Sequence, residues 1–164
     1  MADISKIKVL FESVENLAPS GCAIALHIRL TTPDFLFQTY PKEWTDIYSK
    51  QGYVMQDPTV RWGFVETGSI RWSGLIEMDD HNILGLSRAY GMAYGVTFAT
   101  DTSGSRSLAS FSRPDREYSD EEIKQLSRSF QALHDMTASQ GGISEIWHTE
   151  LHHLSVKMTH ASTT

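Results

Sequence analysis

The side chains best suited to bind a small molecule are concentrated in residues 40–58, which hold four Tyr and Trp residues, two prolines and Asp57. Tyr48 follows Trp44 by four residues, so a helix over residues 41–50 would place both on one face. Buried Tyr and Trp side chains each bring a polar hydrogen that needs an acceptor. Together with Trp72, these residues could line an apolar cavity with two donors and one acceptor at its mouth. Such a cavity suits a small ligand that carries carbonyls and an N–H.

The same residues also fit a purely structural arrangement. Their aromatic rings would pack a helix onto a sheet. Asp57 directly precedes Pro58, and Asp before a Pro at the first helical position is a good N-cap. Considered alone, the residues favour capping as the role of Asp57 and leave the cavity open as an alternative.

Other patterns for catalysis or cofactor binding are absent from the sequence. It contains no G-x-G-x-x-G, Walker, G-x-S-x-G or H-E-x-x-H motif. His148 and His152 would share a helix face and are the best metal candidates. Zinc, however, needs three or four converging ligands, and no Cys or acid falls at motif spacing beside them. A Ser–His–Asp triad leaves no spacing signature, so it stays open on this ground. We expect no metal, no cofactor and no enzymatic activity.

Composition narrows the classes of partner. The chain has 164 residues, which fits one domain, and its formal net charge of −6 opposes non-specific binding to nucleic acid. The single cysteine, Cys22, excludes an internal disulfide and indicates a reducing compartment. Its apolar neighbours favour a small buried side chain over a nucleophile. There is no secretory signal and no apolar run long enough to cross a bilayer, so we expect a cytoplasmic protein.

Periodicity and turn residues predict helices and hairpin-linked strands, and therefore an α+β domain on an antiparallel sheet. The predicted strands cover residues 22–30, 34–40, 94–100 and 106–112. The predicted helices cover residues 4–17, 41–50 and 58–65, a segment from Asp79 or Asp80 to near Gly91, and residues 120–137. Ser119 and Glu122 have the spacing of a capping box for the last of these. Gly141 and Gly142 are the best candidates for a break, after which a second helical segment follows.

The spaced pattern Trp44-x3-Tyr48-x8-Asp57-Pro58-x13-Trp72, with Gly95 in "YGVTF", resembles the autoinducer-binding domain of LuxR-type quorum-sensing regulators. Tyr40, four residues before Trp44, also fits. The resemblance implies an α-β-α sandwich with a five-stranded antiparallel sheet that binds an N-acyl homoserine lactone between sheet and helices. The patterns above give four strands, so the fifth is expected near "SIRWS".

The resemblance also implies a role for each site residue. Trp44 would donate its indole N–H to the lactone carbonyl, Asp57 would accept the ligand amide N–H, and Tyr40 would bond the acyl carbonyl. Ser110 would contact oxygens of the acyl chain, and Tyr48 and Trp72 would pack on the chain and the ring. The candidate tail contacts are Ala23, Ala25, Leu36, Phe64, Val65, Leu75 and Leu108. Ala99, where the family often has proline, and Ser105 and Arg106 leave the preferred chain length open.

The expected organisation is an autoinducer-binding domain over residues 1–140 and a helical linker or tail over 141–164. Full-length relatives carry a helix-turn-helix DNA-binding domain, and this sequence contains none. We therefore expect a homodimer that reaches DNA only through such a domain, as part of a longer regulator. The alternatives are a receptor that sequesters ligand or pairs with a full-length regulator, a sensor of another small molecule on the same fold, and a lactone hydrolase or acylase. The last lacks clustered His and Asp ligands.

Overall fold

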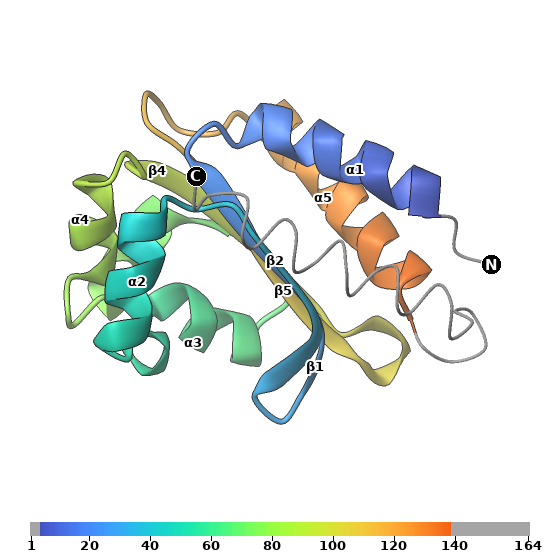
Figure 1. The fold of residues 1–164 in the computed structure, drawn as a ribbon, viewed down its shortest axis with the longest axis horizontal. Helices are drawn as coiled ribbons and strands as arrows, with labels where there is room; N and C mark the ends of the chain where they lie inside the picture. Colours follow the sequence, from blue (N-terminus) through green and yellow to red (C-terminus); the bar gives the residue numbers. More distant parts are fainter. Residues whose placement is uncertain (1–3, 139–164) are drawn as a thin grey trace.

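The computed structural model describes residues 4–138 (Figure 1). The predicted break at Gly141, the helical tail over 141–164 and the pair His148 and His152 lie outside the described residues.

A five-stranded antiparallel sheet with the order β2-β1-β5-β4-β3 forms the middle layer. Its strands are β1 (Gly21–Arg29), β2 (Thr32–Gln38), β3 (Gly68–Arg71), β4 (Tyr94–Thr100) and β5 (Arg106–Arg113). The α-helices are α1 (Ile4–Leu17), α2 (Lys42–Lys50), α3 (Pro58–Val65), α4 (Ile83–Arg88) and α5 (Asp120–Met136). Three 3₁₀ segments complete the described part: η1 (Tyr53–Met55), η2 (Trp72–Met78) and η3 (Thr102–Gly104).

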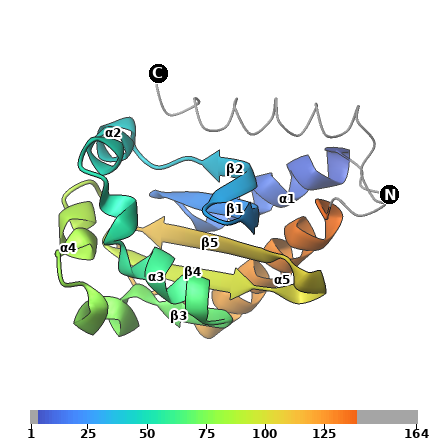
Figure 2. The ribbon, with the colours of Figure 1, turned by 90° about the horizontal axis from the view of Figure 1, so that it is seen from below.

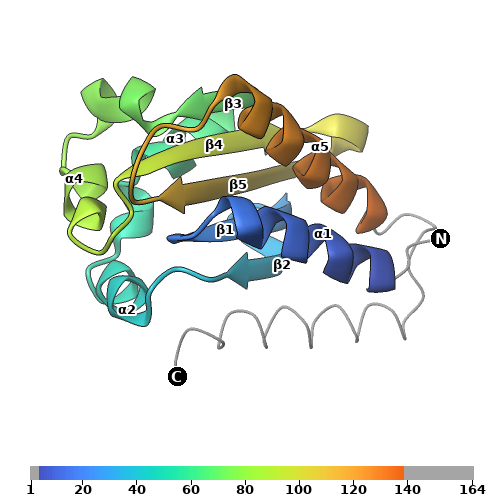
Figure 3. The same ribbon diagram turned by 90° about the horizontal axis from the view of Figure 1, so that it is seen from above.

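The helices form two layers on opposite faces of the sheet. Helices α1 and α5 lie side by side over one face (Figure 3), and α2 and α3 lie on the other, with α4 near the start of β4 (Figure 2). The predicted α+β class and the α-β-α sandwich are thus confirmed. So is the fifth strand expected near "SIRWS", because β3 pairs with β4 from Gly68 opposite Ala99 to Arg71 opposite Val96.

One predicted helix start was wrong. The helix expected from Asp79 or Asp80 begins at Ile83. Asp79 acts just before it, since its carboxylate accepts the backbone N–H groups of Ile83 and Leu84 at 2.7 and 2.9 Å. Asp79 thus satisfies free N–H groups at the start of α4 as an N-cap would, although it lies four residues before the first helical residue. For this reason the sequence placed the start of the helix too early.

The face of the sheet under α1 and α5 is a packed apolar core. Large side chains of β1, β2, β4 and β5 meet Phe11 of α1 and Phe130 of α5 in one buried cluster. Each such side chain stabilises the fold by about 1.5–3 kcal/mol through burial. Cys22 lies in this cluster with no exposed surface, and burial raises its thiol pKa to about 11. The prediction of a small buried side chain is confirmed.

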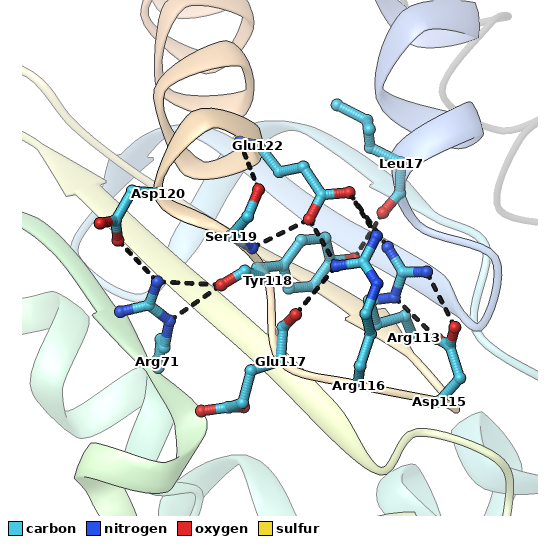
Figure 4. A network of polar contacts seen from close by, with 10 residues as sticks. All are labelled: Leu17, Arg71, Arg113, Asp115, Arg116, Glu117, Tyr118, Ser119, Asp120 and Glu122. Atoms are coloured by element: carbon cyan, nitrogen blue, oxygen red, sulfur yellow. Dashed lines mark hydrogen bonds and ion pairs between the residues drawn. The ribbon is translucent and has the colours of Figure 1, made fainter.

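The start of α5 is fixed by the predicted capping box (Figure 4). The Ser119 hydroxyl accepts the backbone N–H of Glu122 at 3.2 Å, and the Glu122 carboxylate accepts the backbone N–H of Ser119 at 2.9 Å. Arg116 and Arg113 also donate to Glu122. These hydrogen bonds, chiefly from Arg116, lower the pKa of Glu122 to about 2.

Tyr118, next to this box, links both helices of the core layer to the edge strand (Figure 4). Its hydroxyl donates to the carbonyl of Leu17 at the end of α1, 2.6 Å away. Its own carbonyl accepts from the Arg71 guanidinium of β3 at 2.9 and 3.0 Å. These hydrogen bonds tie the core layer to the edge strand β3.

Candidate ligand-binding site

A cavity of about 390 Å³ lies between the second face of the sheet and the segment that runs from α2 to α4. Its lining is mainly apolar and aromatic, with a few polar groups. All six residues singled out in the sequence lie on it: Tyr40, Trp44, Tyr48, Asp57, Trp72 and Ser110. The structure thus brings together side chains that are up to seventy residues apart in the chain.

A row of residues in register across neighbouring strands lies on the cavity side of the sheet. Gln38 of β2 is opposite Ala23 of β1, Ala23 is opposite Ser110 of β5, and Ser110 is opposite Thr97 of β4. Directly opposed residues of antiparallel strands point to the same face of the sheet. Because Ala23 and Ala25 are short, space remains above the middle of the sheet.

Trp44 forms the centre of the aromatic wall. Its ring lies 6.0, 5.9 and 5.5 Å from the rings of Tyr48, Tyr53 and Tyr90, and the residue is 4% exposed. Among residues 4–138 its indole N–H has no hydrogen-bond partner. No completely buried side-chain nitrogen or oxygen in that part of the chain lacks a partner. The Trp44 N–H therefore opens onto accessible space and is free to donate to a bound molecule.

Among residues 4–138, Asp57 is the carboxylate that lines this cavity, and it is buried. It caps α3, as predicted: Oδ1 accepts the backbone N–H of Thr59 at 2.8 Å and the Thr59 hydroxyl at 2.7 Å. Oδ2 accepts the Tyr48 hydroxyl at 2.7 Å. Burial raises the pKa of Asp57, and these three hydrogen bonds oppose the shift. A carboxylate has about four lone-pair sites, so one on Oδ2 remains for a further donor.

Tyr40 brings a second hydroxyl to the cavity. It donates to the carbonyl of Ser110 at 3.4 Å, a long hydrogen bond that a better acceptor could replace. Burial raises the pKa of Tyr40 well above its usual range. The phenol therefore stays protonated and acts as a donor.

Trp72 lies flat against the start of β4. A Cβ atom on Gly95 would come within 2.2 Å of its ring, so only glycine allows this packing. The Trp72 indole N–H donates to the Thr97 hydroxyl at 3.0 Å, and that hydroxyl lies 2.7 Å from the Ser110 hydroxyl. Thr97 was not predicted from the sequence. The one signal for it is its spacing, two residues after Gly95 and thus on the same face of the strand.

The expected tail contacts divide into two groups. Two of them do not line the cavity: Val65 is 74% exposed, and Leu75 is buried in the cluster of Trp44 and Trp72. The others do line it: Ala23, Ala25, Leu36, Phe64 and Leu108.

Within residues 4–138, no cluster of three or more His, Cys, Asp or Glu side chains has a geometry that could hold a metal ion. In the same part of the chain, no helix has both the length and the apolar character needed to cross a membrane.

A family model described as the autoinducer binding domain matches residues 22–139. The chain belongs to this family. The match covers all of the sheet except Gly21 at the start of β1, together with all six candidate residues, and it confirms the resemblance inferred from the spaced motif.

Individual relatives agree with this assignment. The transcriptional activator protein YukR of Yersinia ruckeri is 34% identical over 68 residues, which are 39% of this chain and 30% of YukR. A crystal structure of CepR2 from Burkholderia cenocepacia, described as an N-acylhomoserine lactone dependent LuxR family transcription factor, aligns with a TM-score of 0.59 at 19% identity. That alignment covers 93% of this chain and 83% of CepR2. Escherichia coli SdiA aligns with a TM-score of 0.60 at 19% identity, covering 84% of this chain and 64% of SdiA. These structural matches support the fold.

Proposed function

We propose that this autoinducer-binding domain binds an N-acyl homoserine lactone in the cavity between the sheet and α2, α3 and α4. The observation that carries the proposal is the pairing of a free donor with a buried acceptor on one apolar cavity. The donor is the indole N–H of Trp44, which has no hydrogen-bond partner among residues 4–138, and the acceptor is the Asp57 carboxylate. A lactone carbonyl and an amide N–H complement these two groups.

Each polar part of the ligand then has a partner. Trp44 donates to the lactone carbonyl, Asp57 Oδ2 accepts the amide N–H, and Tyr40 donates to the acyl carbonyl. A ligand without that N–H would leave the buried carboxylate short of a donor, at a cost of about 1–3 kcal/mol. Tyr48 and Trp72 pack on the chain and the ring, and Tyr48 also holds Asp57 in place through its hydroxyl.

The acyl tail extends over the small and apolar side chains of the sheet, including Ala25 and Leu108. Each CH₂ group buried there contributes roughly 0.8 kcal/mol. The head-group contacts therefore set the class of ligand, and the depth of the cavity sets the preferred chain length. A cavity of about 390 Å³ falls in the size range of small-molecule sites.

The experiment is a thermal-shift series with lactones of short to long acyl chain. The wild-type domain gains Tm on ligand addition, since binding to the folded state stabilises it by mass action. Trp44→Phe removes the N–H together with part of the ring system and keeps an aromatic side chain. Asp57→Asn keeps the helix cap while replacing Oδ2 with a donor or a weaker acceptor. Both variants lose most of the shift. Trp62→Phe is the matched control, because Trp62 does not line the cavity, and it keeps the shift. No Tm rise with any lactone would contradict the proposal.

In a longer LuxR-type regulator, this binding would control dimerisation and the DNA binding of a helix-turn-helix domain. A homodimer would place two such DNA-reading units on a two-fold site. We further propose that the domain acts in the cytoplasm and returns its ligand chemically unchanged, which recovery of intact lactone after long incubation would test. A chain that works without a DNA-binding domain would instead sequester ligand or pair with a full-length regulator.

A different small molecule on the same fold is the second candidate. SdiA has been solved in complex with octanoyl-rac-glycerol, so a protein with this fold accepts an acylglycerol. Mass spectrometry of compounds extracted from the purified domain separates the two candidates. A homoserine lactone supports the first, and an acyl ester of glycerol supports the second.

A further inference from the structure

Three side chains from three different elements form a hydrogen-bonded chain beneath the cavity. The Trp72 indole N–H of η2 donates to the Thr97 hydroxyl of β4 at 3.0 Å, and the Thr97 and Ser110 hydroxyls lie 2.7 Å apart across β4 and β5. Thr97 is 1% exposed and does not line the cavity itself, whereas Ser110 does.

The direction of this chain follows from the chemistry of its first member. An indole nitrogen is a donor only, so the Thr97 oxygen must accept from Trp72. The Thr97 proton then needs an acceptor of its own, and among the described residues the oxygen within reach is that of Ser110. The reverse assignment, with Ser110 donating to Thr97, would leave the Thr97 proton without a partner in the interior, which is unfavourable.

The Ser110 hydroxyl is thereby left with one role. Its oxygen accepts a hydrogen bond from the Thr97 hydroxyl. Its own hydroxyl hydrogen has no acceptor among residues 4–138, so it is available to a molecule bound in the cavity. Ser110 is therefore set up to donate to a bound molecule.

We propose that Thr97 is a positioning residue that orients the Ser110 hydroxyl as a hydrogen-bond donor, so that the cavity selects ligands with an oxygen acceptor on the acyl segment. This inference rests on the proposed function, because the acceptor belongs to the bound lactone. Beyond the proposed function, it assigns a role to Thr97, which does not touch the ligand, and it makes the Ser110 hydroxyl a donor to the ligand.

The test is a double-mutant cycle with the best-binding lactone, read by its Kd. Thr97→Val has nearly the same shape but no hydroxyl, so it frees Ser110 to turn away from the ligand and weakens binding about tenfold, the size expected for one neutral hydrogen bond. Ser110→Ala weakens binding by a similar factor. The double variant binds no more weakly than Ser110→Ala alone, since Thr97 acts only through Ser110.

Three controls separate positioning from packing. Thr97→Ser keeps the hydroxyl and restores binding to within about twofold, well under one tenfold step of affinity. Thr100→Val removes another buried hydroxyl of β4, on the opposite face, and leaves Kd unchanged. Thermal melts without ligand show that each variant is folded.

The outcomes distinguish this inference from the proposed function. A wild-type domain that binds no lactone overturns the proposed function and the Thr97 role with it. If the wild type binds, then a normal Kd for Thr97→Val, or losses that simply add in the double variant, overturns the positioning role alone.

Discussion

The two faces of the central sheet are built from the same strands and are suited to opposite tasks. On the face under α1 and α5, β1 presents Cys22, Ile24 and Leu26, all without exposed surface. On the other face the same strand presents Ala23 and Ala25, which leave the cavity open. Alternation along a strand thus assigns stability to one face and binding to the other. Substitutions on the two faces should separate these properties.

The largest effect is expected from the core face. Phe98 of β4 is 2% exposed and packs against Phe111 and Phe130, with ring centroids 5.6 and 6.0 Å away. Phe98→Ala should lower the free energy of unfolding by about 3–5 kcal/mol. Denaturant unfolding without ligand measures this loss. The matched variant Phe64→Ala removes a ring that lines the cavity and is 40% exposed, so it should cost little stability and weaken lactone binding. Equal loss of stability in both variants would contradict the assignment of stability to the core face and binding to the cavity face.

An intermediate effect on stability and on lactone affinity is expected at Gly95 of β4, where the Trp72 ring packs against the strand. Gly95→Ala would place a methyl group 2.2 Å from the Trp72 ring and force that side chain off the sheet. Overpacking of this kind costs about 1–3 kcal/mol of stability. Lactone affinity should fall as well, because the displaced Trp72 ring no longer packs on the ligand. Gly104→Ala, in η3 between β4 and β5, is a contrasting variant, since nothing lies within 4 Å of its added Cβ. It should leave lactone affinity unchanged, although its positive φ of 73° strains any side chain. Normal lactone affinity in Gly95→Ala would contradict this account.

The smallest effect concerns pH and lies at the far end of the core layer. A bulge in β1 between Ala25 and Ile28 brings His27 against His134 of α5, with stacked rings 4.5 Å apart. Burial, with a contribution from His134, lowers the pKa of His27. The nearby charges of Asp34 and Arg29 shift this pKa in opposite directions. The folded state then binds fewer protons than the unfolded state below the ordinary His pKa of about 6.5. Stability should therefore fall as pH drops through about 6.5.

Urea midpoints across this pH range measure the slope of stability against pH. His27→Asn, which suits the left-handed backbone at this position, should flatten the slope, whereas His81→Asn on the exposed surface should not. A slope that survives in His27→Asn would assign the effect to other groups.

The features that could be predicted from the sequence are those with strong local signals. Asp57 before Pro58 predicted the cap of α3, and Ser119 with Glu122 predicted the capping box of α5, because both depend on a few neighbouring residues. The short edge strand β3 came only from the family resemblance, since four residues give no clear alternation. The 3₁₀ segment η2 was not predicted from the sequence either.

Thr97 escaped sequence reading for a different reason. Threonine is common in strands, and "YGVTFAT" looks like an ordinary buried strand. What distinguishes this threonine is the approach of Trp72 and Ser110 from other elements. Such long-range contacts leave no pattern along the chain.

The Asp57 carboxylate links ligand binding to the order of the α3 backbone, and hydrogen exchange at a single amide can report this link. Its Oδ1 holds the N–H of Thr59 in the first turn of α3, while Oδ2 faces Tyr48 and the cavity. A ligand N–H on Oδ2 would restrain the same carboxylate and slow the opening of that turn. Hydrogen exchange at Thr59 would then act as a built-in occupancy reporter, slower with lactone bound and fast again in Trp44→Phe.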